Sequence, residues 1–165
     1  MDLVCLDTHI LIWGIKEEAT PDRVEMIPRA KYFFSELTKA KTKALVPSVV
    51  IGEFLLKIPA SAHVTVLNLM RETFITAPYD LQAAARFAAL WQERSESNFI
   101  KRLQDELGAT RAELRADCMI VATALAQNAS CIYSHDRKLK TFAGDAIPVV
   151  ELPREQDQLP LGFPS

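Results

Sequence analysis

Glycine is scarce in this chain of 165 residues, which contains only 5 of them. No glycine-rich loop follows the first apolar run, and a GxGxxG pattern is absent there. This argues against a dinucleotide-binding protein, which needs such a loop to hold a pyrophosphate. A phosphatase with an aspartyl nucleophile is also disfavoured, because Asp7-Thr8-His9 lacks the second acid of a DxD motif.

Paired cysteines, long apolar runs and excess positive charge are missing as well. The 3 cysteines form no CxxC motif and lie among apolar residues, as buried thiols do in a reducing compartment. No apolar run is long enough to cross a membrane, and no signal peptide is visible, so we expect a cytoplasmic protein without a membrane partner. Because the formal net charge is -2, any contact with nucleic acid must be local.

Short apolar runs alternate with helical patterns along the chain. Apolar runs without polar alternation indicate strands that are buried on both faces of a parallel sheet. Strands are expected at residues 3–6, 43–46, 74–76, 131–133 and 147–150, the last at a sheet edge because it contains a proline. Helices are expected at residues 10–15, 21–41, 48–58, 62–73, 80–91, 110–127 and 138–142. The alternation predicts an α/β fold with a mostly parallel central sheet flanked by helices.

Local signals add detail to this outline. Ser48 can cap the helix that follows it. Residues 95–107 are more charged than their surroundings and are predicted to be an exposed helix or an irregular excursion. Residues 1–152 are expected to form one domain, and residues 153–165 a proline-rich tail with little structure of its own.

Four acidic residues occupy positions where solvent is not expected. Asp7 and Asp136 each follow a buried strand, where sites of parallel sheets form, whereas Glu53 and Asp117 lie on apolar helix faces. A buried carboxylate without a partner is unfavourable, and neighbouring carboxylates repel one another. A Mg²⁺ or Mn²⁺ ion, which prefers oxygen ligands, would offset this cost. These four acids are therefore our candidate metal ligands and catalytic residues.

Such a site would suit two-metal hydrolysis of a phosphodiester, in which one ion lowers the pKa of the attacking water and the other stabilises the leaving oxygen. Each acid also has a simpler interpretation. Asp7 and Asp136 could be helix caps, Glu53 could reach solvent, and Asp117 could pair with Arg111 or Arg115. Four such coincidences in one chain are less plausible than a single site.

The motifs around these acids resemble those of PIN-domain nucleases, in the same order, from residue 3 to about residue 150. They are Leu6-Asp7-Thr8-His9, Ser48-Val49-Val50-Ile51-Gly52-Glu53, Arg115-Ala116-Asp117-Cys118 and Ser134-His135-Asp136. The resemblance implies a three-layer, Rossmann-like PIN fold and a Mg²⁺- or Mn²⁺-dependent endoribonuclease that cleaves RNA. It also implies frequent homodimers and, for the many bacterial members of the VapC type, a toxin that an antitoxin protein holds inactive.

Two features depart from the family pattern. His9 stands where an asparagine is common, and the stretch from Ser95 to Arg111 is longer than the usual connection before the third motif.

Other polar residues flank the four acids. Thr8 and Ser134 are candidates to hydrogen-bond the carboxylates or water on the metal, although both could serve local turns instead. Candidates for contact with RNA are His9, His135, Arg137, Lys138 and Arg115. Their simpler interpretation is a solvated helix face.

Two other functions stay open. The same metal site could serve a DNA-directed nuclease, and side-by-side cleavage of RNA and DNA would distinguish the two. An inactive PIN-fold binding or scaffold module is the other alternative. Such members usually lose acids, whereas this chain keeps all four.

Overall fold

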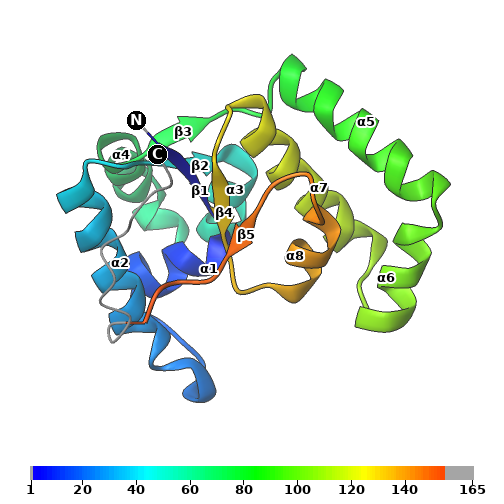
Figure 1. Ribbon diagram of the computed structural model, residues 1–165. Helices are drawn as coiled ribbons and strands as arrows, with labels where there is room; N and C mark the ends of the chain where they lie inside the picture. Colours follow the sequence, from blue (N-terminus) through cyan, green and yellow to red (C-terminus); the bar gives the residue numbers. More distant parts are fainter. Residues whose placement is uncertain (1, 155–165) are drawn as a thin grey trace.

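Five short strands form a parallel sheet in the computed structural model, which describes residues 2–154 (Figure 1). Their order across the sheet is β3-β2-β1-β4-β5, and each neighbouring pair is parallel. The strands are β1 (Leu3–Leu6), β2 (Lys43–Pro47), β3 (Ile75–Ala77), β4 (Cys131–Tyr133) and β5 (Val149–Val150). The predicted α/β class is thus confirmed, and β5, which directly follows Pro148, lies at an edge of the sheet as expected.

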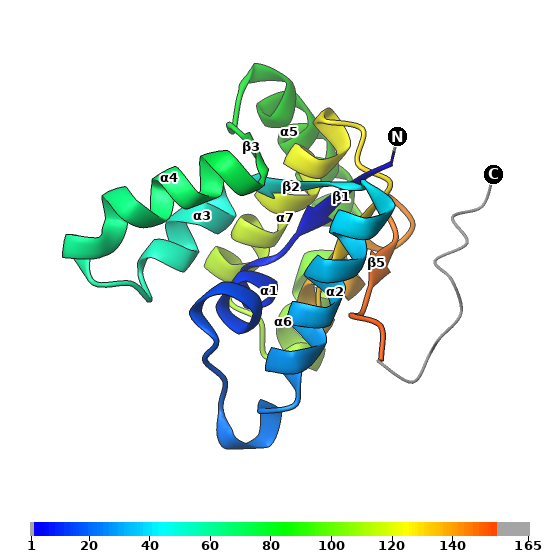
Figure 2. The same ribbon diagram turned by 90° about the vertical axis from the view of Figure 1, so that its left-hand side faces the viewer.

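Helices cover both faces of this sheet, so the molecule has three layers (Figures 1 and 2). α2 lies on one side, whereas α7 and α8, with α5 and α6 beyond them, lie on the other. The α-helices are α1 (Thr8–Leu11), α2 (Met26–Ala40), α3 (Ser48–Leu55), α4 (His63–Thr73), α5 (Leu81–Glu96), α6 (Phe99–Leu107), α7 (Arg111–Ala126) and α8 (Arg137–Ala143). A π-helical turn η1 (Ile12–Lys16) and the 3₁₀ turns η2 (Pro21–Arg23) and η3 (Ala60–Ala62) complete the elements.

The core lies between the central strands and the helices. Val4, Cys5 and Leu6 of β1 have no exposed surface. This explains the uninterrupted apolar run in the sequence, because a central parallel strand is covered on both faces. None of the described helices is long and apolar enough to cross a membrane.

The prediction of one continuous helix at residues 21–41 is wrong. The chain forms the short turn η2, and α2 begins only at Met26. Pro28 explains the break, because a proline is tolerated in the first turn of a helix but not further inside it. As a result, residues 17–25 form a loop that projects from the body of the molecule (Figure 2).

The prediction that Ser48 caps the helix after it is also wrong. Pro47 holds the cap position of α3, and Ser48 Oγ instead accepts a hydrogen bond from the backbone N–H of Tyr79. Because β2 leads into α3 without a loop, no separate capping residue lies between the two elements.

The charged stretch 95–107 contains the end of α5 and the whole of α6. α6 is amphipathic, with Ile100 and Leu103 buried. Of the expected tail, only residues 153 and 154 are described, so its structure and the domain boundary at residue 152 stay predictions.

Candidate active site

Asp7 and Asp136 follow neighbouring strands. Leu6 of β1 pairs with Tyr133 of β4, so the chain after both strands emerges at the same edge of the sheet. Asp7 Oδ1 accepts a hydrogen bond from Thr8 N at 2.7 Å, and Asp136 Oδ1 accepts one from Lys138 N at 2.7 Å. Both acids are therefore helix caps, as the simpler interpretation holds. Each cap uses only one carboxylate oxygen, which leaves the other for a second partner.

Two hydroxyl groups connect the acids across the site. Ser134 Oγ donates to Asp7 Oδ2 at 2.6 Å and accepts from the backbone N–H of Asp136 at 3.0 Å. Thr8 Oγ1 donates to Glu53 Oε2 at 2.5 Å, which joins the start of α1 to α3. Three segments that are distant in sequence, at residues 7–8, 53 and 134–136, are thus joined by hydrogen bonds.

Burial raises the pKa of Asp7 above its ordinary value. Asp7 is 6% exposed, so its charged form has lost most of its hydration. The hydrogen bonds from Ser134 and Thr8 oppose this effect, because they favour the carboxylate, and the charge of Asp136 adds to it. The site therefore holds a charge that is only partly compensated.

Asp117 is the least compensated of the four acids. Its Oδ2 atom is buried and, among the described residues, has no hydrogen-bond partner. The expected alternative of an ion pair with an arginine is not found, since Arg111 and Arg115 lie over the ring of Trp91 at 5.5 and 5.6 Å. Burial, followed by the charges of Asp136, Asp7 and Glu53, raises the pKa of Asp117 to about 8. All four candidate acids are therefore close enough to act on one another electrostatically.

The acids do not converge into a finished metal site. Within residues 2–154, no three histidine, cysteine or acidic side chains are placed to hold a metal ion together. The hydrogen bonds above give a physical reason, because the hydroxyls of Thr8 and Ser134 occupy carboxylate oxygens of Glu53 and Asp7.

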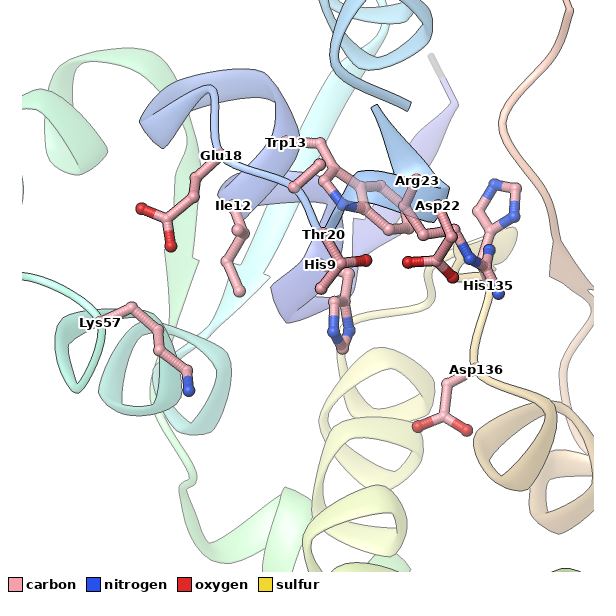
Figure 3. Close-up of a pocket in the computed structure, with 11 residues that line it drawn as sticks. His9, Ile12, Trp13, Glu18, Thr20, Asp22, Arg23, Lys57, His135 and Asp136 are labelled. Carbon is pink, nitrogen blue, oxygen red and sulfur yellow. The ribbon is translucent and has the colours of Figure 1, made fainter. Parts of the chain in front are cut away.

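A pocket of about 440 Å³ adjoins the acids on the side of α1 and η1 (Figure 3). Asp136 is the one candidate acid in its lining. The other lining residues come from α1, η1, the projecting loop, the turn after α3 and the end of β4: His9, Ile12, Trp13, Glu18, Ala19, Thr20, Asp22, Arg23, Lys57 and His135. This pocket is thus beside the acids and not centred on them.

His135 is held in place by the chain that follows β5. Its side chain is 8% exposed, and its Nε2 atom accepts a hydrogen bond from Leu152 N at 2.9 Å. Burial lowers the pKa of His135, and because Nε2 accepts this hydrogen bond, the ring carries its proton on Nδ1. Arg29 of α2 donates to the carbonyl oxygens of Leu152 and Pro153 and fixes the same segment from the other side.

The remaining candidates for RNA contact are dispersed. Lys138 forms an ion pair with Glu113 at 3.1 Å. Arg137 is exposed, and Arg115 lies against Trp91 of α5. Only His9 and His135 share a concave surface, the pocket beside the acids.

Sequence reasoning did not single out Arg23 or Lys57, which both line this pocket. Lys57 follows Glu53 by four residues, so helical spacing could have placed the two on one side of the helix predicted at residues 48–58. Arg23 gave no such signal, because its segment was predicted to be part of a regular helix.

The family model described as PIN domain matches residues 4–145. The chain belongs to the PIN-domain family. Among curated proteins no significant match is found. The family match includes all four candidate acids and the whole described sheet except Leu3 of β1 and the strand β5.

Solved structures support the same fold. A chain of VapBC2 from Rickettsia felis, bound to a DNA fragment from its promoter, is similar with a TM-score of 0.64 and 14% identity. The similarity covers 92% of this chain and 99% of that chain. VapBC-1 from nontypeable Haemophilus influenzae is similar with a TM-score of 0.61 and 13% identity, over 91% of this chain and 98% of that chain. DNA-bound VapBC from Salmonella typhimurium is similar with a TM-score of 0.59 and 16% identity, over 93% of this chain and 100% of that chain.

Proposed function

We propose that this PIN domain is a Mg²⁺- or Mn²⁺-dependent endoribonuclease that hydrolyses RNA in the cytoplasm. One observation carries the proposal. Asp117 is half-buried, its buried Oδ2 atom has no hydrogen-bond partner among the described residues, and burial together with the nearby carboxylates of Asp136, Asp7 and Glu53 raises its pKa. A local excess of negative charge of this kind is costly unless a cation offsets it.

The residues present fit a hard divalent cation. Every donor of the cluster is a carboxylate oxygen, the ligand that Mg²⁺ and Mn²⁺ prefer. Asp7, Glu53, Asp117 and Asp136 would hold the metal. When bound, it would lower the pKa of an attacking water and neutralise charge on the phosphate.

The protein's own groups then have defined tasks. Ser134 and Thr8 orient Asp7 and Glu53 through their hydroxyl donors. The Asp136 carboxylate is fixed from its other side by the first turn of α8. No side chain is required to form a covalent bond with the substrate, because water is the nucleophile.

Asparagine variants test this function. Asp7→Asn and Asp117→Asn should each reduce Mg²⁺-dependent cleavage of RNA by at least about 100-fold, since a metal ligand is lost. Asp105→Asn is the control, because Asp105 is exposed on α6, away from the cluster. Parallel assays with single-stranded DNA decide between the two nucleic acids. Full activity in both site variants would contradict the mechanism.

Calorimetric titration with Mn²⁺ gives a readout that does not depend on activity. The wild-type protein and Asp105→Asn should bind the ion, and Asp117→Asn should bind it more weakly. An inactive scaffold module would bind none.

We further propose that the protein is the toxin of a toxin–antitoxin pair and forms homodimers. The three similar structures are VapBC complexes, which supports an antitoxin partner. Co-expression with the product of an adjacent short gene should yield a stable complex in which RNA cleavage is suppressed. Recovery of uncomplexed, active protein would count against this pairing.

Exposed apolar residues support the dimer. Leu56 after α3 is 85% exposed, and Val64 of α4 is 71% exposed. Figure 2 shows α3 and α4 projecting from the body of the molecule. An apolar surface of this kind on a projecting pair of helices is typical of a contact with another protein.

A further inference from the structure

The pocket of about 440 Å³ beside the acids is open to a ligand that also touches the catalytic cluster (Figure 3). Asp136 is shared between the two, so a group in the pocket lies directly next to a phosphate held at the acids. We call this feature the Trp13 pocket and define it by Ile12, Trp13, Arg23, Lys57 and His135.

One wall of the Trp13 pocket is apolar and aromatic. Trp13 is 5% exposed, and the rings of His9 and His135 lie 5.5 Å from its ring. His9 itself is exposed and offers a free ring face. Aromatic and imidazole rings of this kind stack on unpaired bases of RNA.

Two cations lie on opposite sides of the Trp13 pocket. Figure 3 shows Lys57 on one side and Arg23 on the other, with His9 between them. Neither Lys57 nor Arg23 forms an ion pair within the described part of the chain. Both are therefore free to bind an anionic group.

The acids at the rim offset this positive charge only in part, because Glu18 pairs with Lys16 while Asp22 stays charged beside Arg23. Glu18 forms an ion pair with Lys16 at 2.6 Å. Asp22 accepts a hydrogen bond from Thr20, which lowers its pKa, with a smaller attraction to Arg23. In a chain of net charge -2, the Trp13 pocket thus presents cations where the substrate backbone must pass.

We propose that the Trp13 pocket binds the nucleotide adjacent to the scissile phosphate and sets the sequence preference of cleavage. The base stacks on His9 against the aromatic wall, and Arg23 and Lys57 contact the flanking phosphates. This inference rests on the proposed ribonuclease function. It adds a specificity site that is separate from the metal ligands.

Binding of RNA is measured with the non-cleaving Asp7→Asn protein and labelled five-nucleotide RNAs of each base, by fluorescence anisotropy. Arg23→Ala and Lys57→Ala in this background should each raise the Kd about 5- to 10-fold. Because a phosphate contact is lost, each should also lower the slope of log Kd against log salt by about 0.7. Lys101→Ala, an exposed cation on α6, is the matched control and should change neither quantity.

A local readout comes from tryptophan fluorescence. The chain has 2 tryptophans, so Trp91→Phe leaves Trp13 as the single reporter. RNA should change the emission of Trp13 in this protein, and Arg23→Ala should weaken that response in parallel with the Kd.

Cleavage separates this proposal from the proposed function. In the otherwise wild-type protein, Arg23→Ala and Lys57→Ala should raise KM and alter the preferred cleavage sites, with kcat within about 3-fold. If both variants bind and cleave like wild type, the Trp13 pocket is not the specificity site, while the ribonuclease function stands. If wild type binds RNA through the pocket but cleaves none, the ribonuclease function fails and the binding site stands. If it neither binds nor cleaves RNA, both are overturned.

Discussion

At the scale of single residues, Asp117 links stability to function. Its carboxylate is held among other acids, and its pKa is raised to about 8 in the folded protein, compared with an ordinary value of 3.8. The folded state therefore binds a proton that the unfolded state releases at lower pH. By linkage, the metal-free protein loses stability as pH rises from about 4 to about 8.

Asp117→Asn should remove this loss, because an amide does not ionise. In a chelating buffer, the difference in Tm between variant and wild type should grow in favour of the variant from pH 5 to pH 8. Each 1 kcal/mol corresponds to about 2–4 °C in a domain of this size. Thermal unfolding followed by circular dichroism measures the trend. A difference that is constant across this range would show that Asp117 is not strained by its charge.

Much of the candidate site could be predicted at this scale, because its signal is local. An acid after an uninterrupted apolar run, such as Asp7, is informative without any knowledge of the fold. The partners of Thr8 and Ser134 could not be predicted, since each hydroxyl bonds a residue brought near only by tertiary packing. The pairing of Lys138 with Glu113 was hidden for the same reason, because 25 residues separate the two in sequence.

At the scale of elements, two glycines differ in what surrounds them. An ideal Cβ on Gly14, in η1, would lie 2.1 Å from Cε2 of Phe34 on α2. A Cβ on Gly52, inside α3, would meet nothing within 4 Å. Gly14 therefore permits the close approach of η1 to α2, whereas Gly52 carries only the cost of glycine in a helix.

The substitutions Gly14→Ala and Gly52→Ala should accordingly change the free energy of unfolding in opposite directions. Gly14→Ala should lower the free energy of unfolding by about 1–3 kcal/mol, because Phe34 must move from its packing site. Gly52→Ala should raise it by up to about 1 kcal/mol through helix propensity. Urea denaturation of the two variants against wild type measures both. A loss of stability in Gly52→Ala as large as that in Gly14→Ala would contradict this account.

The elements themselves were largely predictable, since period and composition distinguish a buried strand from an amphipathic helix. The break between η2 and α2 shows the limit. The apolar spacing of residues 27–37 extends smoothly into the preceding segment, and only Pro28 indicates where the helix must begin. The order of the strands across the sheet was not available from sequence, because pairing depends on contacts between distant segments.

At the scale of the whole molecule, the exposed apolar surface of α3 and α4 is where we expect the interface of the proposed homodimer. If the protein dimerises through this surface, Leu56→Asp and Val64→Asp should each convert the dimer to a monomer, because a charge in an apolar contact must be desolvated. Leu81→Asp is the control, since Leu81 is 89% exposed but lies at the start of α5. Light scattering after gel filtration gives the mass. An unchanged dimer in both α3–α4 variants would place the interface elsewhere.

The hydrogen bond between Leu152 and His135 also has a practical consequence for anyone who engineers this protein. The last described residues are tied to the body of the molecule at two points, by the hydrogen bond from Leu152 to His135 and by the hydrogen bonds from Arg29 to the carbonyl oxygens of Leu152 and Pro153. Shortening the chain to residue 151 would remove the backbone N–H of Leu152 that donates to Nε2 of His135, so the imidazole would be free to rotate. A purification tag fused beyond residue 154 leaves these contacts intact, whereas trimming past residue 152 removes a contact of His135, which lines the pocket that we propose as the specificity site.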